Sequence, residues 1–100
     1  MSEQSLKDKR GDLTVEVRRD GKNVQAMLSG LDALNGMPKS RTCQWIAHAI
    51  ADHPAFAGVT KGPERDGTIV YKIVLVRPDT KAAGIILELI FEITGRPGPQ

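Results

Sequence analysis

Residues 68–95 constrain the fold of this chain more than any other part, because they hold its densest apolar content. Positions 69–76 are rich in β-branched residues and lie between Gly67 and Pro78, a composition typical of a strand. Both faces of that strand are apolar, and only Lys72 interrupts the pattern. We therefore predict a central strand with both faces covered, and not an edge strand with one face in water.

A helix is predicted after this strand, because Asp79 is a suitable N-cap residue and Gly95 a suitable C-terminal stop. At about 100° per residue, the polar side chains Lys81, Glu88 and Glu92 form one narrow stripe. The rest of the helix is apolar, which is more than an ordinary surface helix needs. Its predicted core face consists of Ala82, Ile86, Leu89, Ile90 and Ile93.

One flank of this helix, formed by Ala83, Leu87 and Phe91, needs a cover of its own. Two partners could pack on this flank: the N-terminal arm of the same chain, or a second protein, which includes another copy of this chain. A membrane span is excluded by the short apolar run and by Glu88, since a span needs about 20 apolar residues.

Length and composition indicate one domain with two flanking segments. We expect a flexible arm at 1–11, a single folded domain at 12–95 and a disordered tail at 96–100. The single cysteine cannot form an intrachain disulfide, and the N-terminus has no apolar leader. A cytoplasmic location is therefore expected.

The N-terminal half of the domain begins with a strand. Positions 13–18 alternate apolar and polar side chains, which predicts a strand with one buried face. The pair Asp20-Gly21 follows, and Asp-Gly is a common hairpin turn. A second strand directly after this turn would complete a hairpin.

Residues 24–35 fit two templates equally well in their apolar spacing. As a strand they complete the hairpin, and as a helix they have a cap and a stop of their own. The Asp-Gly turn and the pair Ser29-Gly30 favour the strand, with residues 31–37 as a helical turn or loop.

A further helix is predicted at 41–53, with Ser40 as its cap and Pro54 as its stop. Its core face consists of Cys43, Ile46, Ala47 and Ile50. Cys43 is then a buried apolar residue and not a reactive thiol. The opposite face carries Arg41, Gln44, Trp45, His48 and Asp52. Because tryptophan and arginine are enriched at binding hot spots, we expect either a recognition surface there or a segment packed over Trp45.

A short strand at 58–61, a loop at 62–67 and the central strand form a second hairpin. The predicted fold is a small α+β domain: an antiparallel sheet of about four strands in ββαββα order, with two helices packed on it. If residues 24–35 are helical, the order becomes βααββα over residues 13–95, which resembles a winged helix in architecture.

The spacing of reactive side chains does not indicate catalysis. Cys43 and His48 lie on opposite faces of one helix, so they cannot act as nucleophile and base. His48 and Asp52 are four residues apart, but no nucleophile accompanies them. His48 and His53 lack the spacing of adjacent metal ligands on a helix. We predict a non-enzymatic protein without cofactor or metal.

Protein interaction is the first functional hypothesis. A small module with an apolar helix flank and an exposed tryptophan is typical of accessory or modulator proteins, including those that phages and mobile elements carry. We expect it to bind another protein or itself, as a homodimer through the C-terminal helix. The residues expected at the partner surface are Arg41, Trp45, His48, Leu87 and Phe91.

Nucleic-acid binding is the alternative. A formal net charge of +2, from 14 basic and 12 acidic residues, indicates such a partner only if the basic residues cluster. In the winged-helix-like interpretation, helix 41–53 enters the major groove and the tip 61–67 contacts phosphates. Glu64 and Asp66 on that tip oppose this, because DNA is negatively charged. The residues expected at this surface are Arg18, Arg19, Lys22, Lys39, Arg41, Gln44, Lys61 and Arg65.

Overall fold

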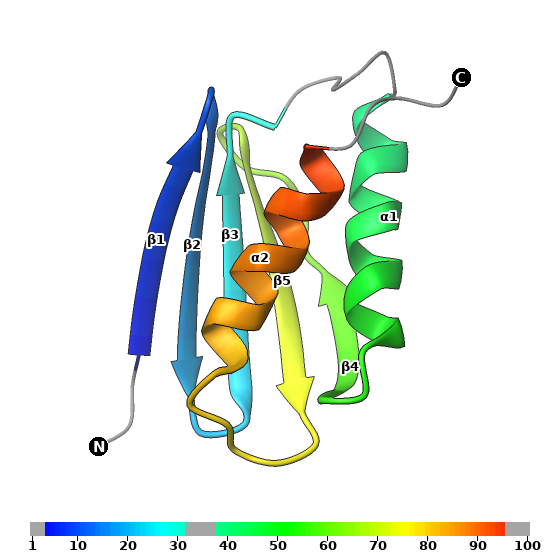
Figure 1. The fold of residues 1–100 in the computed structure, drawn as a ribbon. Coiled ribbons are helices and arrows are strands. Elements are labelled where there is room, and N and C mark those ends of the chain that lie inside the picture. The colour runs from blue at the N-terminus through cyan, green and yellow to red at the C-terminus, as the bar shows by residue number, and fades with distance from the viewer. Residues whose placement is uncertain (1–3, 32–37, 96–100) are drawn as a thin grey trace.

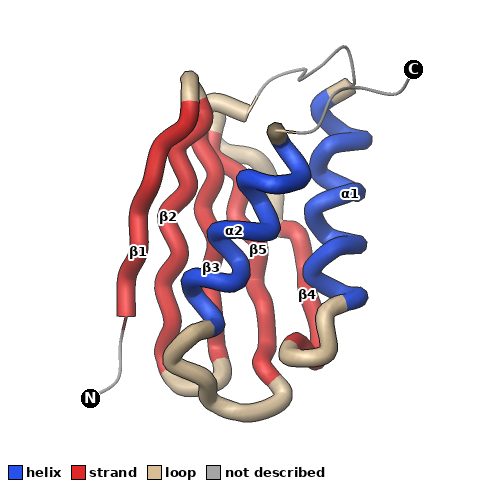
Figure 2. Tube along the Cα trace, viewed as in Figure 1, coloured by secondary structure: helices blue, strands red, loops and turns tan. Residues whose placement is uncertain are grey.

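The computed structural model describes residues 4–31 and 38–95. Their order is β1 (Gln4–Arg10), β2 (Leu13–Asp20), β3 (Asn23–Ser29), α1 (Lys39–Asp52), β4 (Phe56–Lys61), β5 (Thr68–Leu75) and α2 (Ala82–Thr94). The strands form one antiparallel sheet in the order β1-β2-β3-β5-β4. Both helices lie on the same face of this sheet, with α1 beside β4 and α2 crossing towards β1 and β2 (Figures 1 and 2).

The architecture confirms the predicted α+β class, the antiparallel sheet and the two helices packed on it. The sheet has five strands where about four were predicted. The additional strand is β1, in the region where a flexible arm was expected. A two-residue turn at Gly11 and Asp12, with Gly11 at φ 60°, folds β1 back onto β2. Of the predicted arm and tail, residues 1–3 and 96–100 lie outside the described residues.

The segment that fitted two templates is strand β3 at residues 23–29. It lies between β2 and β5, and Val24, Ala26 and Leu28 point into the core. A helix here would leave both neighbouring strands without their pairing partner. The structure therefore rejects the helical alternative, and the winged-helix-like order with it. The turn or loop predicted after β3 falls mostly on residues 32–37, which lie outside the described residues.

Strand β5 is central as predicted, because β3 and β4 pair with its two edges. The prediction that both of its faces are covered is wrong. Ile69, Tyr71, Ile73 and Leu75 are buried under the helices, whereas Val74 is 45% exposed on the other face, and Val76 beyond the strand is 50% exposed. Valine favours strands through its β-branched shape as well as through burial, so its presence did not require a second layer.

The helix ends differ slightly from the predicted ones. Helix α1 starts at Lys39 with Pro38 in the N-cap position, so Ser40 lies within the helix and does not cap it. Asp79 lies before α2, where its carboxylate accepts a hydrogen bond of 2.9 Å from the Lys81 backbone N–H. It therefore organises the turn that leads into the helix.

The two helices cover different parts of the sheet. The predicted core faces are buried, with Cys43, Ile46 and Ile50 on α1 and Ala82, Ile86, Ile90 and Ile93 on α2; Ala47 and Leu89 are only partly buried. A hydrogen bond of 2.9 Å joins α1 to β5; the Tyr71 hydroxyl donates it to the Cys43 carbonyl. No helix of the described chain covers the other face of the sheet, which we call the open sheet face (Figure 1).

Candidate functional site

Three of the five residues predicted at a partner surface lie together on α1. Arg41 and His48 are exposed, and Trp45 is half-buried because it packs against the core from the side of the helix that faces α2. An open cleft of about 350 Å³ lies at this position, between the two helices. It is lined by Trp45, His48, Ala49, Asp52 and Ile93. Trp45 is thus neither fully exposed nor covered by a loop of the described chain.

The other two predicted residues, Leu87 and Phe91, lie on α2. Phe91 is only 3% exposed, and the Arg10 guanidinium lies 4.7 Å from the centre of its ring. Strand β1 therefore covers this flank from within the chain, which was one of the two covers considered. Leu87 is half-buried. A partner that needs Phe91 exposed would have to displace β1.

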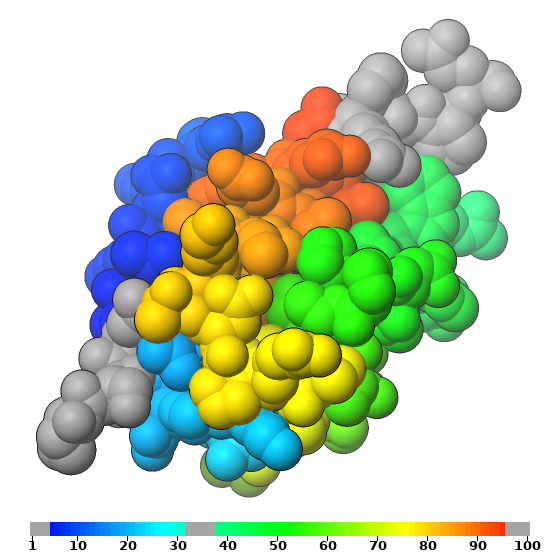
Figure 3. Space-filling model, turned by 60° about the horizontal axis from the view of Figure 1, so that its bottom comes forward, coloured from blue at the N-terminus to red at the C-terminus, as the bar shows by residue number. Residues whose placement is uncertain are grey.

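The residues predicted for nucleic-acid binding do not form one surface. Arg18 lies on the open sheet face, 3.3 Å from the Glu16 carboxylate. Arg19 is 3% exposed and donates a 3.0 Å hydrogen bond to the Gly21 carbonyl. Lys22 lies in the β2–β3 turn, at the end of the molecule where the C-terminal end of α1 also lies (Figure 3). Alternation explains the position of Arg19, because it shares the inward face of β2 with Val15 and Val17.

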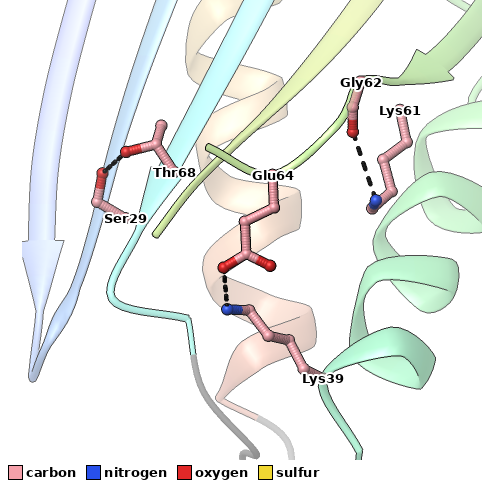
Figure 4. Close-up of polar contacts among 6 residues, drawn as sticks. All are labelled: Ser29, Lys39, Lys61, Gly62, Glu64 and Thr68. Carbon is pink, nitrogen blue, oxygen red and sulfur yellow. Dashed lines mark hydrogen bonds and ion pairs between the residues drawn. The ribbon is translucent and has the colours of Figure 1, made fainter. Parts of the chain in front are cut away.

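The remaining five lie at the opposite end of the sheet (Figure 1). Three of them, Lys39, Arg41 and Gln44, are on α1, and Lys61 and Arg65 are at the β4–β5 hairpin. The Lys39 ammonium lies 2.6 Å from the Glu64 carboxylate, so acidic charge accompanies the basic charge there (Figure 4). The basic residues are thus divided between the two ends and the open face.

The open sheet face is a surface that the sequence did not reveal. Its exposed residues include Lys7, Lys9, Arg18, Gln25 and Lys72. The four aromatic side chains of the sequence all lie on the helix side: Trp45, Phe56, Tyr71 and Phe91. An exposed sheet that binds single-stranded nucleic acid uses aromatic rings on which bases stack. This face has basic charge but no such ring.

A second cavity separates the start of α1 from the β4–β5 hairpin, with a volume of about 570 Å³. We call it the α1–β4 groove; it is lined by Lys39, Ser40, Cys43, Gln44, Ala47, Lys61, Glu64 and Ile69. Lys39, Lys61 and Glu64 are charged, and Figure 4 shows the ion pair that Lys39 and Glu64 form. The elements that form it, α1 and the β4–β5 hairpin, follow each other in the chain, but the groove results from how they pack, so no local pattern could indicate it.

The acid and the base that were considered for catalysis do not interact in the part of the chain that the structure describes. His48 and Asp52 are both exposed, and no hydrogen bond joins them. Burial and the hydrogen bond to Cys43 raise the pKa of the Tyr71 hydroxyl above its ordinary value, which keeps it neutral. No group of three or more His, Cys, Asp or Glu side chains among the described residues could hold a metal ion.

Neither described helix is long and apolar enough to cross a membrane. Comparison with protein-family models, with curated proteins and with solved structures finds no significant match to this chain.

Proposed function

We propose that the chain is a non-enzymatic protein-interaction module that binds a partner protein through the outer side of α1. The observation that carries this proposal is Trp45, the only tryptophan, which forms one wall of an open cleft between the two helices. A half-buried tryptophan is held in place by its own fold and still offers a large ring edge to a partner. Arg41 and His48 lie on the same side of the helix and supply polar contacts around it.

A protein partner fits these surfaces better than a nucleic acid. The basic residues are divided among three places, and one of them, Lys39, is paired with Glu64. Affinity for DNA or RNA depends on several cations that meet the phosphates together. The open sheet face also lacks an aromatic ring for base stacking. We place the module in the cytoplasm and assign it no cofactor, in line with its single, buried cysteine.

The proposal is tested by photo-crosslinking. A photoreactive amino acid at position 48 should capture a discrete partner protein in an extract of the source cells, and the same group at position 72, on the open sheet face, should not. The capture at position 48 should be lost in Trp45→Ala, whose folding is checked by circular dichroism. Equal capture from both positions, or capture that persists in folded Trp45→Ala, would contradict the proposed surface.

A second experiment addresses the alternative partner. Trp45 fluorescence should stay unchanged when mixed-sequence duplex DNA or RNA is added at low salt. Quenching that weakens steeply as salt rises would indicate release of counterions from a basic surface, and would favour the nucleic-acid hypothesis instead.

A further inference from the structure

One edge of the sheet, strand β4, is unpaired within the described chain. β4 pairs with β5 alone, and the Gly62 N–H donates a 2.7 Å hydrogen bond to the Val70 carbonyl. Since alternate residues of an antiparallel strand face the same neighbour, residues 58, 60 and 62 direct their backbone groups to β5. The N–H and C=O groups of Val59 and Lys61 therefore point away from the sheet.

Among the devices that prevent strand pairing, β4 shows only the irregular pairing between Phe56 and Gly58, at its start. Its first five residues, 56–60, are uncharged, and Lys61 is the first charge along it. Natural proteins protect exposed edges with charged side chains, prolines or covering segments. The irregular pairing between Phe56 and Gly58 affects only the beginning of β4.

The side of α1 next to this edge carries one charge, at Lys39, which is paired with Glu64. Ser40, Gln44 and Ala47 line the α1–β4 groove, and helical spacing places Ala51 on the same side. The other charged residues of the helix, Arg41 and Asp52, lie around the outer side. A second backbone and helix can therefore approach β4 without burying an unpaired charge of α1 along this side.

We propose that β4 pairs antiparallel with β4 of a second copy of this chain, about a two-fold axis at Val59, so that the two sheets become one. This register uses the free backbone groups of both strands. It places Val59 opposite Val59 and Lys61 opposite Ala57, so no like charges face each other. Such an interface is self-complementary, as a two-fold dimer requires.

The charge of the strand itself supports a second copy as the occupant. Residues 56–60 are uncharged and Lys61 faces an alanine in this register, so two copies of β4 pair without opposing like charges. The partner's segment after α1, which holds Pro54 and Ala55, then approaches the α1–β4 groove. Self-pairing of β1 would instead bring together several charges from Lys7 to Arg10.

The dimer goes beyond the proposed function, because it uses a different side of α1. With the axis perpendicular to the sheet, both α1 helices lie on one face of the joined sheet and both Trp45 clefts stay open. A partner with two binding segments would then gain from simultaneous contact.

The first test is sedimentation velocity of the full chain over a wide concentration range. We expect a reversible dimer, and we expect Val59→Pro to raise its dissociation constant at least tenfold, because proline removes an N–H that only the second copy uses. The matched control is Lys7→Pro, which removes an outward-facing N–H from the other edge strand and should leave the dimer intact. Circular dichroism establishes that both variants are folded.

The second test does not depend on whether Val59→Pro folds. In a Cys43→Ala background, Val59→Cys should form a covalent dimer on mild oxidation, because directly opposed Cα atoms lie about 5.5 Å apart, within disulfide range. Thr60→Cys, which lies opposite Gly58 in this register, should not. A wild-type chain that stays monomeric, a dimer unchanged in folded Val59→Pro, or equal crosslinking of both cysteine variants would each overturn the proposal. Loss of Trp45-dependent capture in a chain that still dimerises would contradict only the proposed function.

Discussion

The two edge strands of the sheet, β1 and β4, differ in both burial and charge. β1 is exposed at every position whose side chain is described, and it carries four consecutive charges, Lys7 to Arg10. It is held to the domain by pairing with β2 and by contacts with α2. β4 lies under α1 and carries one charge, at Lys61. The edge that is least buried is therefore the one best protected against another strand. In this molecule, side-chain charge and not burial distinguishes the edge strand that is protected against pairing from the one that is not.

The largest expected effect comes from removing the ring that holds β1. Phe91→Ala should lower the free energy of unfolding by about 3–5 kcal/mol, because it leaves a cavity between α2 and β1. Chemical denaturation measures this loss, and the half-buried Leu87→Ala is the matched control, with a smaller expected loss. Amide exchange should accelerate first in β1 and later in β4. A loss below about 1 kcal/mol would mean that β1 does not depend on α2.

A smaller effect is expected on the β4 side. Tyr71→Phe removes the hydrogen bond from the hydroxyl to the Cys43 carbonyl and should cost about 0.5–1.5 kcal/mol. The pKa of Tyr71 is raised in the folded state, so its contribution to stability is complete below the unfolded pKa of 10.0 and is lost as the pH rises above it. The free energy of unfolding should therefore fall more steeply above pH 10 in the wild type than in Tyr71→Phe. Parallel pH profiles would show that the hydroxyl ionises equally in both states.

The smallest effect on stability is expected from removing charges of β1. This change also tests directly whether charge protects the β1 edge against pairing. In the Val59→Pro background, Lys7→Thr combined with Lys9→Thr should change the free energy of unfolding by no more than about 0.5 kcal/mol, because both side chains are exposed. The variant should nevertheless associate, since β1 loses two of its protecting charges. Sedimentation velocity at high protein concentration measures this. A variant as monomeric as its Val59→Pro parent would show that charge is not what closes this edge.

Much of the fold could be predicted from local patterns. The alternation at 13–18, the buried positions of β5 and the apolar stripes of both helices each have a period that identifies the element. Strand β3 could not be separated from a helix, because Val24 and Leu28 fit both periods and only pairing with β2 and β5 decides between them. Strand β1 was missed because Leu6 is its only apolar residue among the positions whose side chains are described.

The surfaces were harder to predict than the elements. Helical spacing alone places Arg41, Trp45 and His48 on one side of α1, but it could not show that Trp45 packs against the core there. The sequence left two segments that could cover Phe91. Strand β1 covers it, and the sequence did not reveal that strand. The α1–β4 groove and the open edge of β4 result from the order of strands in the sheet, which local spacing does not encode.

The pairing of β3 with β5 has a consequence for how the chain folds. β2 and β3 are joined by a tight turn, and so are β1 and β2, whereas β3 and β5 meet only across a long separation. The hydroxyls of Ser29 and Thr68 lie 3.1 Å apart although 39 positions separate them in the sequence (Figure 4). Closing such a loop costs more chain entropy than closing a hairpin, so we expect the pairing of β3 with β5 to be the slow step of folding. Variants at the pairing of β3 with β5 should then slow refolding, whereas variants in the outer hairpins should mainly accelerate unfolding.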